Sequence, residues 1–393
     1  MARASAPGIN WRAAALLGLI SSTWSTLASH FAAARIGRDA VVDWMVVAAI
    51  PLRDGVLQPD PGLGTILAGI AFHQWADFSW AVVFFALLGR WTAQLRPLTI
   101  AVVAGPWALF TSAIEWFALV PLAPFFQPVF TLNQPYWIGL LVHATSAALY
   151  PLFPWLRDRV AGVVPSPHRR GAAAVAGGAG LTLAGLGLLA ALGAAGHEWP
   201  PHPGRNQAYD QSWMRRMDAH HEQGVRLGLM AVERAQDPRL RSVAGLIVAS
   251  QRSEREVLAH WWRSWFGGGM PPPEHGDHAA MPGMLPEEAF AELAQAPAEA
   301  FDGRFVALMT HHHQGAIAMA DEAIREAGAL RIRLMSHAIR HGQRGEVELM
   351  HGTRGWDAVR QATVNMLRPA GWVRADGALG RPEILTGAEA PHR

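Results

Sequence analysis

The chain has 393 residues, of which 51% are hydrophobic and only 16% are charged, whereas soluble proteins carry about 25% charged residues. Its long apolar stretches lie almost entirely within residues 1–196, and most of the charged residues and histidines follow them. The formal net charge of +2 is too small an excess to indicate nucleic-acid binding. The sequence has no cysteine, which excludes disulfides and thiolate-bound metal clusters.

Five segments of the N-terminal half are long and apolar enough to cross about 30 Å of hydrocarbon as helices. The apolar stretch 41–52 is too short to do so, and we expect it to lie at the membrane interface or to re-enter the membrane. The last of the five segments also resembles a cleavable signal sequence, but its internal position favours a retained span. The predicted spans are 12–34, 63–89, 98–120, 136–156 and 171–195.

Arginine placement predicts the orientation of these spans, because cytoplasmic loops retain positive charge. Most arginines near the spans precede the first one, or lie between the second and third or between the fourth and fifth. These three groups share one side of the membrane if the N-terminus is cytoplasmic. Five spans then place the C-terminal half outside the cytoplasm.

Ionisable side chains within the predicted spans are costly in lipid unless they face water or a partner. Most of them fall in the outer half of the membrane, and two share a helix face at i, i+4 spacing. They predict a metal or proton site that opens to the outside; the alternative is a set of hydrogen bonds between helices. The residues of this predicted intramembrane site are His73, Asp77, Glu115 and His143.

The C-terminal half contains an internal repeat. With a constant offset of 92, residues 209–258 align with 301–350 without a gap, and 13 of the 50 positions are identical. In the first copy, Asp237 and Pro238 form a pair that favours the start of a helix, so each copy is expected to be a helical hairpin. Two such hairpins predict a four-helix bundle.

Each predicted hairpin brings potential metal donors to one level, because residues equidistant from the turn of an antiparallel pair lie side by side. The two adjacent histidines of each copy then lie at the level of a Gln and a Glu that are identical in both copies. Thioether together with imidazole suits copper, and Met in particular favours Cu(I). Zinc held by His and Glu stays open, as does a structural core in which Met only fills space and one His of each pair hydrogen-bonds a carboxylate. The residues of this predicted metal layer are Met217, His220, His221, Glu254, Met309, His312, His313, Met319, Glu346 and Met350.

A segment rich in Gly and Pro, 267–284, joins the two hairpins. This composition predicts a flexible linker whose side chains are available to solvent and to metal. A loop with incidental residues is the alternative. The predicted metal-capturing residues of the linker are Met270, His275, His278, Met281 and Met284.

The second copy carries the string Phe301, Asp302, Met309, His312, His313, Gln314, Gly315, Ala316, Met319, Ala320, Gln343, Glu346 and Met350. This string resembles the domain-of-unknown-function 305 family, a ferritin-like group of His- and Met-rich, usually exported bacterial proteins. The resemblance covers about 200–355 and implies a four-helix bundle and, where members have an assigned role, periplasmic copper binding. In the first copy Leu227 and Leu258 replace two of these methionines, which implies a weaker or purely structural site there.

These features predict an all-α protein in which a polytopic membrane domain of about five spans, 1–196, precedes a soluble ferritin-like four-helix bundle. The bundle is expected to consist of a first hairpin, 197–266, a linker, 267–300, and a second hairpin, 301–355. A C-terminal tail, 356–393, is expected to follow. We predict an inner-membrane protein of a bacterium, with a cytoplasmic N-terminus and a periplasmic bundle.

The expected function is membrane-anchored binding of copper, as Cu(I) or Cu(II), for sequestration or delivery; zinc and iron are weaker choices. Its expected partners are the lipid bilayer and the metal ion, with no nucleic acid, and the sequence does not set the oligomeric state. A ferritin-type oxidoreductase is an alternative, but its Glu-x-x-His motif occurs only once, at Glu348 and His351, because Ala259 stands at the equivalent position. An enzyme is therefore not expected. The other alternative is a metal-ion transporter whose bundle captures the ion, which Asp77 near the bilayer centre supports.

Overall fold

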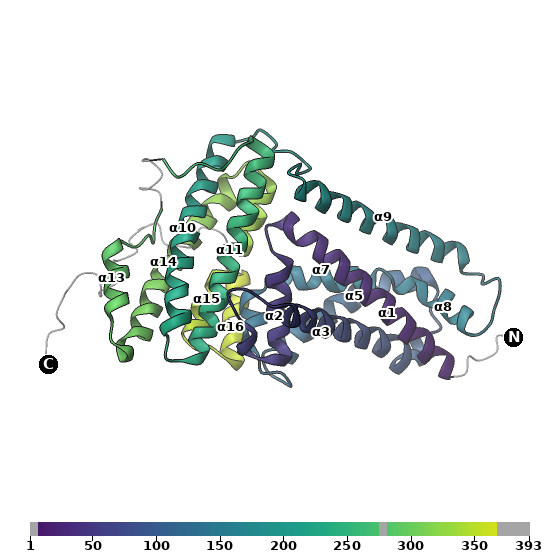
Figure 1. The fold of residues 1–393 in the computed structure, drawn as a ribbon. Helices are drawn as coiled ribbons and strands as arrows, with labels where there is room; N and C mark the ends of the chain where they lie inside the picture. Colours follow the sequence, from purple (N-terminus) through teal and green to yellow (C-terminus); the bar gives the residue numbers. More distant parts are fainter. Residues whose placement is uncertain (1–6, 275–280, 368–393) are drawn as a thin grey trace.

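The computed structural model describes residues 7–274 and 281–367, and all regular secondary structure within these ranges is helical. Figure 1 shows long helices of the N-terminal half running away from a bundle formed by α10, α11, α14 and α15. The N-terminus lies at the end of the membrane half that is farthest from the bundle. The all-helical prediction is confirmed.

The helices of the N-terminal half are α1 (Pro7–Ala32), α2 (Ala40–Leu52), α3 (Leu63–Val82), α4 (Gly89–Thr92), α5 (Pro97–Ile114), α6 (Pro128–Asn133), α7 (Tyr136–Ala147), α8 (Phe153–Val160) and α9 (Arg169–Ala194). Those of the C-terminal half are α10 (Gln207–Arg234), α11 (Pro238–Phe266), α13 (Glu287–Gln295), α14 (Ala298–Glu326), α15 (Leu330–Met350) and α16 (Gly355–Leu367).

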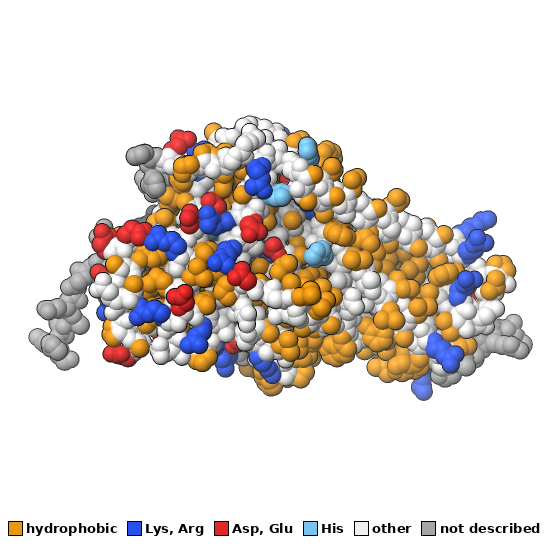
Figure 2. Space-filling model, viewed as in Figure 1, with side chains coloured by type: hydrophobic (Ala, Val, Ile, Leu, Met, Phe, Trp, Pro, Cys, Tyr) orange, Lys and Arg blue, Asp and Glu red, His pale blue; other side chains and the backbone are white. Residues whose placement is uncertain are grey.

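Four helical stretches of the described residues are long and apolar enough to cross a membrane. α1, the first of the five predicted spans, is not among them. It carries a cluster of Ser and Thr residues, 21–26, of which Ser21, Ser22 and Ser25 are buried inside the protein. Figure 2 shows that apolar side chains cover much of the visible face of the membrane half, whereas charged side chains gather on the bundle and at the opposite end. The four stretches are Leu63–Leu87, Pro97–Leu119, Tyr136–Val160 and Arg169–Ala194.

The predicted short apolar piece, 41–52, forms α2, and together with α6 it joins the membrane half to the bundle. The Asp39 side chain accepts hydrogen bonds from the first backbone N–H groups of α2 and so caps the helix. Met45 of α2 and Leu132 of α6 belong to the same buried core as Ile247 of the bundle. The two halves therefore share one hydrophobic core. The predicted division into separate membrane and bundle domains did not anticipate this shared core.

α15 of the bundle approaches α6 so closely that only glycine fits at the crossing. A Cβ atom on Gly345 would lie 2.0 Å from the backbone oxygen of Leu132. α16 packs on both of these helices and buries Ala358 and Ala362. The C-terminal tail expected from residue 356 thus begins with a docked helix rather than a free segment.

The two hairpins cap each other's turns, which explains why the repeat keeps Asp at one position. The Asp302 carboxylate accepts hydrogen bonds from the backbone N–H groups of Gln236 and Asp237, both at 2.9 Å. Asp210 accepts in the same way from the two N–H groups at 328–329, again at 2.9 Å. The turn of each hairpin is therefore held by the other hairpin.

Replacing Asp302 with Ala is expected to destabilise the bundle, because both N–H groups of the first turn lose a charged acceptor. Hydrogen bonds to charged groups contribute about 1.5–3 kcal/mol, so we expect the free energy of unfolding to fall by about 2 kcal/mol. Thermal unfolding of the full chain in detergent, followed by circular dichroism, measures the change. Asp357→Ala on the exposed face of α16 is the control, and an equal midpoint for both variants would contradict the capping role.

Candidate metal centre

The paired histidines of the two hairpins meet at the centre of the bundle. His220, His221, His312 and His313 are all fully buried. The rings of His220 and His312 lie against each other across the hairpin interface, with their centroids 3.9 Å apart and their planes tilted by 35°. Each of them lies beside its neighbour in sequence, at 6.4 Å in α10 and 6.2 Å in α14. Four imidazoles thus form one row, which we call the histidine row.

The two outer rings of the histidine row are held by carboxylates. His221 Nε2 lies 2.6 Å from Glu254 Oε2, and His313 Nε2 lies 2.8 Å from Glu346 Oε2. The antiparallel geometry placed these residues at one level, and the observed contacts are those of the alternative in which one His of each pair hydrogen-bonds a carboxylate. Both carboxylates are therefore engaged in orienting the imidazoles, a role that the predicted ligand set did not give them.

The two inner rings are held by backbone carbonyl groups. His312 Nε2 lies 2.9 Å from the His220 oxygen, and His220 Nε2 lies 3.1 Å from the Pro282 oxygen. A carbonyl oxygen can only accept a hydrogen bond, so Nε2 carries the hydrogen in both rings and Nδ1 keeps a free lone pair.

Several buried polar atoms of this layer have no hydrogen-bond partner among the described residues. They are the Nδ1 atoms of the four imidazoles and both side-chain amide atoms of Gln251 and Gln343. Buried polar groups rarely lack a partner. Metal-binding histidines usually donate their other ring N–H to a carboxylate or a carbonyl, as these four rings can. These unpartnered nitrogen and amide atoms are the donors that the layer has available for a metal ion.

Burial also sets the charge of the inner rings. It lowers the pKa of His220 to about 3 and the pKa of His312 well below its ordinary value, and the neighbouring imidazoles contribute in the same direction. Both rings are consequently neutral at physiological pH. Neutral imidazole is the form that binds metal ions.

The four methionines of the predicted metal layer are all buried. Their grouping into two cores does not follow the two copies of the repeat. Met217 of the first hairpin shares a core with Met319 of the second and with Met281 of the linker. Met309 and Met350 belong to the other core of the bundle. Leu227 and Leu258 replace methionines in the first copy. Met217 of that copy nevertheless shares its core with a second thioether, Met319 of the second copy.

The linker is less free than its composition predicts. Met281 is buried, and Met270 and Met284 are partly buried against the same core, so these methionines are not simply open to solvent. The backbone of Pro282 reaches the histidine row, and a Cβ atom on Gly315 would lie 1.9 Å from its oxygen. His275 and His278, at 275–280, lie outside the described residues.

Carboxylate and imidazole groups alone do not complete a site. Within residues 7–274 and 281–367, no three His, Asp or Glu side chains converge closely enough to hold one metal ion. The Glu348 carboxylate accepts a hydrogen bond from the Thr353 hydroxyl at 2.7 Å, and His351 is exposed. A metal in the bundle would therefore need thioether or amide ligands besides imidazole.

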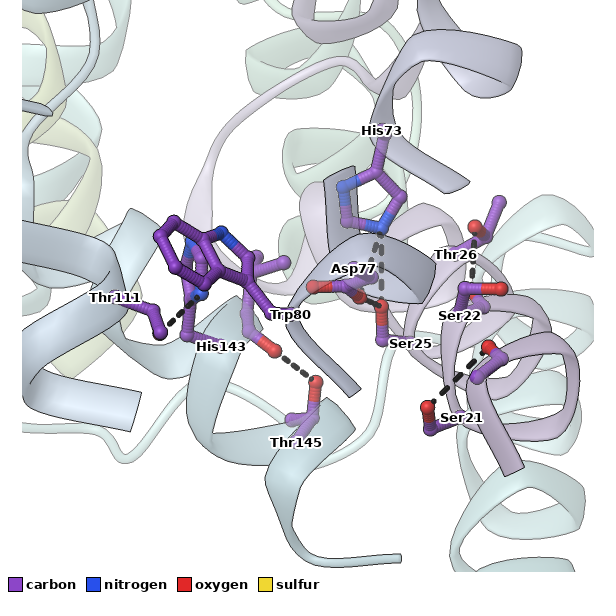
Figure 3. A network of polar contacts seen from close by, with 12 residues as sticks. Ser21, Ser22, Ser25, Thr26, His73, Asp77, Trp80, Thr111, His143 and Thr145 are labelled. Atoms are coloured by element: carbon purple, nitrogen blue, oxygen red, sulfur yellow. Dashed lines mark hydrogen bonds and ion pairs between the residues drawn. The ribbon is translucent and has the colours of Figure 1, made fainter. Parts of the chain in front are cut away.

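The residues of the predicted intramembrane site form two separate pairs. His73 Nε2 lies 3.6 Å from Asp77 Oδ2, both on α3. His143 Nε2 of α7 lies 3.1 Å from Glu115 Oε2 at the end of α5. Figure 3 shows the His73 ring apart from His143, which overlaps the Trp80 ring in this view. These residues therefore form two separate pairs rather than one ligand set: His143 is hydrogen-bonded to Glu115, whereas His73 and Asp77 are joined through the Ser25 hydroxyl.

A polar chamber of about 30 Å³ lies where the bundle meets the membrane half, and the sequence did not point to it. Arg38 donates to Asp43 at 2.5 Å, and Gln134 Nε2 donates to the same carboxylate at 3.0 Å. Gln251 and Glu346 of the bundle line the opposite wall. The one sequence feature that could have indicated this chamber is the close spacing of Arg38 and Asp43 at the start of a short apolar segment.

Comparison with known proteins places the bundle in a family. The family model described as Domain of unknown function (DUF305) matches residues 210–354. A crystallised DUF305 fragment from Deinococcus radiodurans is 31% identical, and the alignment covers 39% of this chain and 97% of that chain with a TM-score of 0.35. This chain belongs to the DUF305 family. The matched residues contain the four-helix bundle, which we call the DUF305 bundle. The membrane helices lie outside the match.

Two other solved structures are similar to the DUF305 bundle. A DUF305 protein from Streptomyces coelicolor is 23% identical, with 37% of this chain and 95% of that chain covered and a TM-score of 0.33. CopM in the Cu(I)-bound form is 26% identical, with 36% of this chain and 92% of that chain covered and a TM-score of 0.31. No curated protein matches the chain.

The buried histidines predict that acid destabilises the DUF305 bundle. Unfolded His has a pKa of about 6.5, whereas burial lowers the pKa to about 3 for both His220 and His341. The unfolded state therefore binds more protons between these values, so the stability contributed by the neutral rings is present above pH 6.5 and is lost as the pH falls toward 3. Burial raises the pKa of Glu346, so protonation of this one carboxylate favours the folded state as the pH falls and partly offsets the effect of the histidines.

We expect the thermal midpoint of the metal-free full chain to fall by several degrees between pH 7 and pH 4. His341→Gln removes one of the buried imidazoles without altering the histidine row and is expected to reduce this pH dependence. The matched control is His351→Gln at an exposed position, which is expected to behave like the unmodified protein. A midpoint that is constant or rises toward pH 4 would contradict the neutral state of the buried rings.

Proposed function

We propose that this protein is a membrane-anchored metal-binding protein whose DUF305 bundle takes up copper. One observation carries the proposal: the histidine row presents four buried Nδ1 atoms without partners, while each Nε2 faces a carboxylate or carbonyl oxygen. An imidazole held at one nitrogen and free at the other is prepared to bind a metal ion. Burial keeps the inner rings neutral, so a proton does not compete for them near pH 7.

The choice of copper rests on the donor atoms of this chain. Thioether sulfur is a soft ligand that selects Cu(I), and imidazole suits copper as well as zinc. Met217 and Met319 are buried in one core of the bundle, and Met309 and Met350 in the other. CopM, the 26% identical relative, has been crystallised with Cu(I), Cu(II) and Ag. Zinc and iron have no comparable preference for thioether.

The membrane half is proposed as an anchor that keeps the bundle outside the cytoplasm, in the periplasm of a bacterium. Four apolar helices of the described residues support an anchor. The proposed orientation also requires α1 to cross the membrane, because an even number of spans would leave the N-terminus and the bundle on the same side. Positive charge gathers at the end opposite the bundle, where the N-terminus lies (Figures 1 and 2). Cytoplasmic ends of membrane proteins retain such charge. The bundle would then meet copper before it enters the cell, for sequestration or for delivery to another protein.

Copper titration of the purified full chain in detergent tests the proposal. Cu(I) and Cu(II) are each expected to bind below micromolar concentration. Replacing both His220 and His312 with Ala is expected to weaken both ions at least tenfold, because the inner pair of nitrogen donors is lost. Met217→Leu with Met319→Leu is expected to weaken Cu(I) at least tenfold but Cu(II) little, since thioether prefers Cu(I).

The Met-to-Leu exchange nearly conserves volume, so it leaves the core packed. Met366→Leu on α16 is the matched control because this methionine is 38% exposed and lies outside the layer. Binding of neither copper ion below micromolar concentration by the unmodified protein would rule out the copper function.

A further inference from the structure

A large cavity lies among the membrane helices, apart from the histidine row. Its volume is about 570 Å³, within the range of small-molecule sites. Thr182 and Leu186 of α9 form one wall, and α9 is exposed along most of its length. Much of the remaining wall is aromatic. Six of the chain's 17 tryptophans line the cavity: Trp24, Trp44, Trp75, Trp80, Trp116 and Trp137.

The cavity contains a carboxylate that no arginine neutralises. Glu115 accepts hydrogen bonds from Trp80 Nε1 and from His143 Nε2, the latter at 3.1 Å, so its ionisable partner is an imidazole rather than a guanidinium. Its side chain is still 21% exposed. Asp43 is the other acidic residue on the wall, and it is paired with Arg38. Among the described residues, no arginine lines the cavity itself.

His73 supplies a second acceptor. The Ser25 hydroxyl donates its hydrogen to Asp77 Oδ2 at 2.5 Å, so it can only accept from His73 Nε2 at 3.0 Å. The hydrogen of the His73 ring is therefore on Nε2, and Nδ1 keeps its lone pair. In Figure 3 this second nitrogen lies on the side of the ring toward Trp80 and His143, and His73 lines the cavity.

The cavity does not suit a bare metal ion. A metal needs several donors at bonding distance, and no three His, Asp or Glu side chains within 7–274 and 281–367 converge in that way. A volume of about 570 Å³ also far exceeds one ion. A protonated amine on an apolar body fits this lining: its charge can face the Glu115 carboxylate, its N–H groups have acceptors on the cavity wall, and tryptophan rings attract cations.

We propose that this cavity binds a lipophilic protonated amine, with Glu115 as its counter-ion and His73 Nδ1 as a hydrogen-bond acceptor. The apolar part of the ligand lies against the tryptophans and can enter from the bilayer beside α9. The proposal is independent of copper binding by the DUF305 bundle, because neither Glu115 nor His73 contacts the histidine row.

Equilibrium dialysis of the full chain in phosphatidylcholine nanodiscs tests the proposal with two matched probes. The first is 2-(1-naphthyl)ethylamine, which is protonated at pH 7, and the second is the neutral 2-(1-naphthyl)ethanol. The amine is expected to bind at least tenfold more tightly than the alcohol. Glu115→Gln is expected to abolish this preference while leaving alcohol binding and the Cu(I) titration unchanged.

The control for the lost carboxylate is Glu287→Gln, since Glu287 is an exposed residue of the bundle, and it is expected to keep the full preference for the amine. If Glu115→Gln does not fold, His73→Leu leaves the carboxylate in place and is expected to lower amine affinity at least threefold without affecting the alcohol. Equal binding of both probes to the unmodified protein would overturn the proposal. So would a tightly bound phospholipid, identified by mass spectrometry, that the amine cannot displace.

Discussion

The burial of four imidazoles with their Nε2 atoms fixed is the constraint on which the bundle depends. Each ring would be costly in a dry core unless an acceptor received its N–H, and two carboxylates and two carbonyl groups meet that need. The surrounding backbone is shaped for this layer. A Cβ atom on Gly224 would lie 2.1 Å from Gln251 Oε1 and 2.8 Å from His312 Cε1, so a larger residue would displace the layer.

The bundle and the membrane half are more closely connected than an anchor requires. α2 and α6 contribute to the bundle core, and glycine at 345 lets α15 touch the α6 backbone. Asp43 lines both the small chamber below the bundle and the large membrane cavity. The two spaces thus share one lining carboxylate, which accepts hydrogen bonds from Arg38 and Gln134.

The parts of this structure that the sequence predicted follow from periodicity. The repeat and the Asp237 cap predicted the hairpins, and antiparallel geometry then placed His221 beside Glu254. What it missed depends on rotation and docking, which spacing alone does not determine. Met319 belongs to the core of Met217 because of how the hairpins pair. The docking of α2 could not be seen because an apolar segment beside predicted spans is equally typical of the membrane interface. The burial of Met281 depends on one carbonyl reaching the histidine row.

The central claim is that buried imidazole nitrogen, with thioether sulfur beside it, binds copper in the bundle. X-ray absorption spectroscopy of the Cu(I)-loaded full chain measures these ligands directly. The account predicts imidazole scattering together with a sulfur shell, and predicts that the imidazole component disappears when His220 and His312 are both replaced by Ala. A copper environment of oxygen ligands alone, or one that this double substitution leaves unchanged, would contradict it.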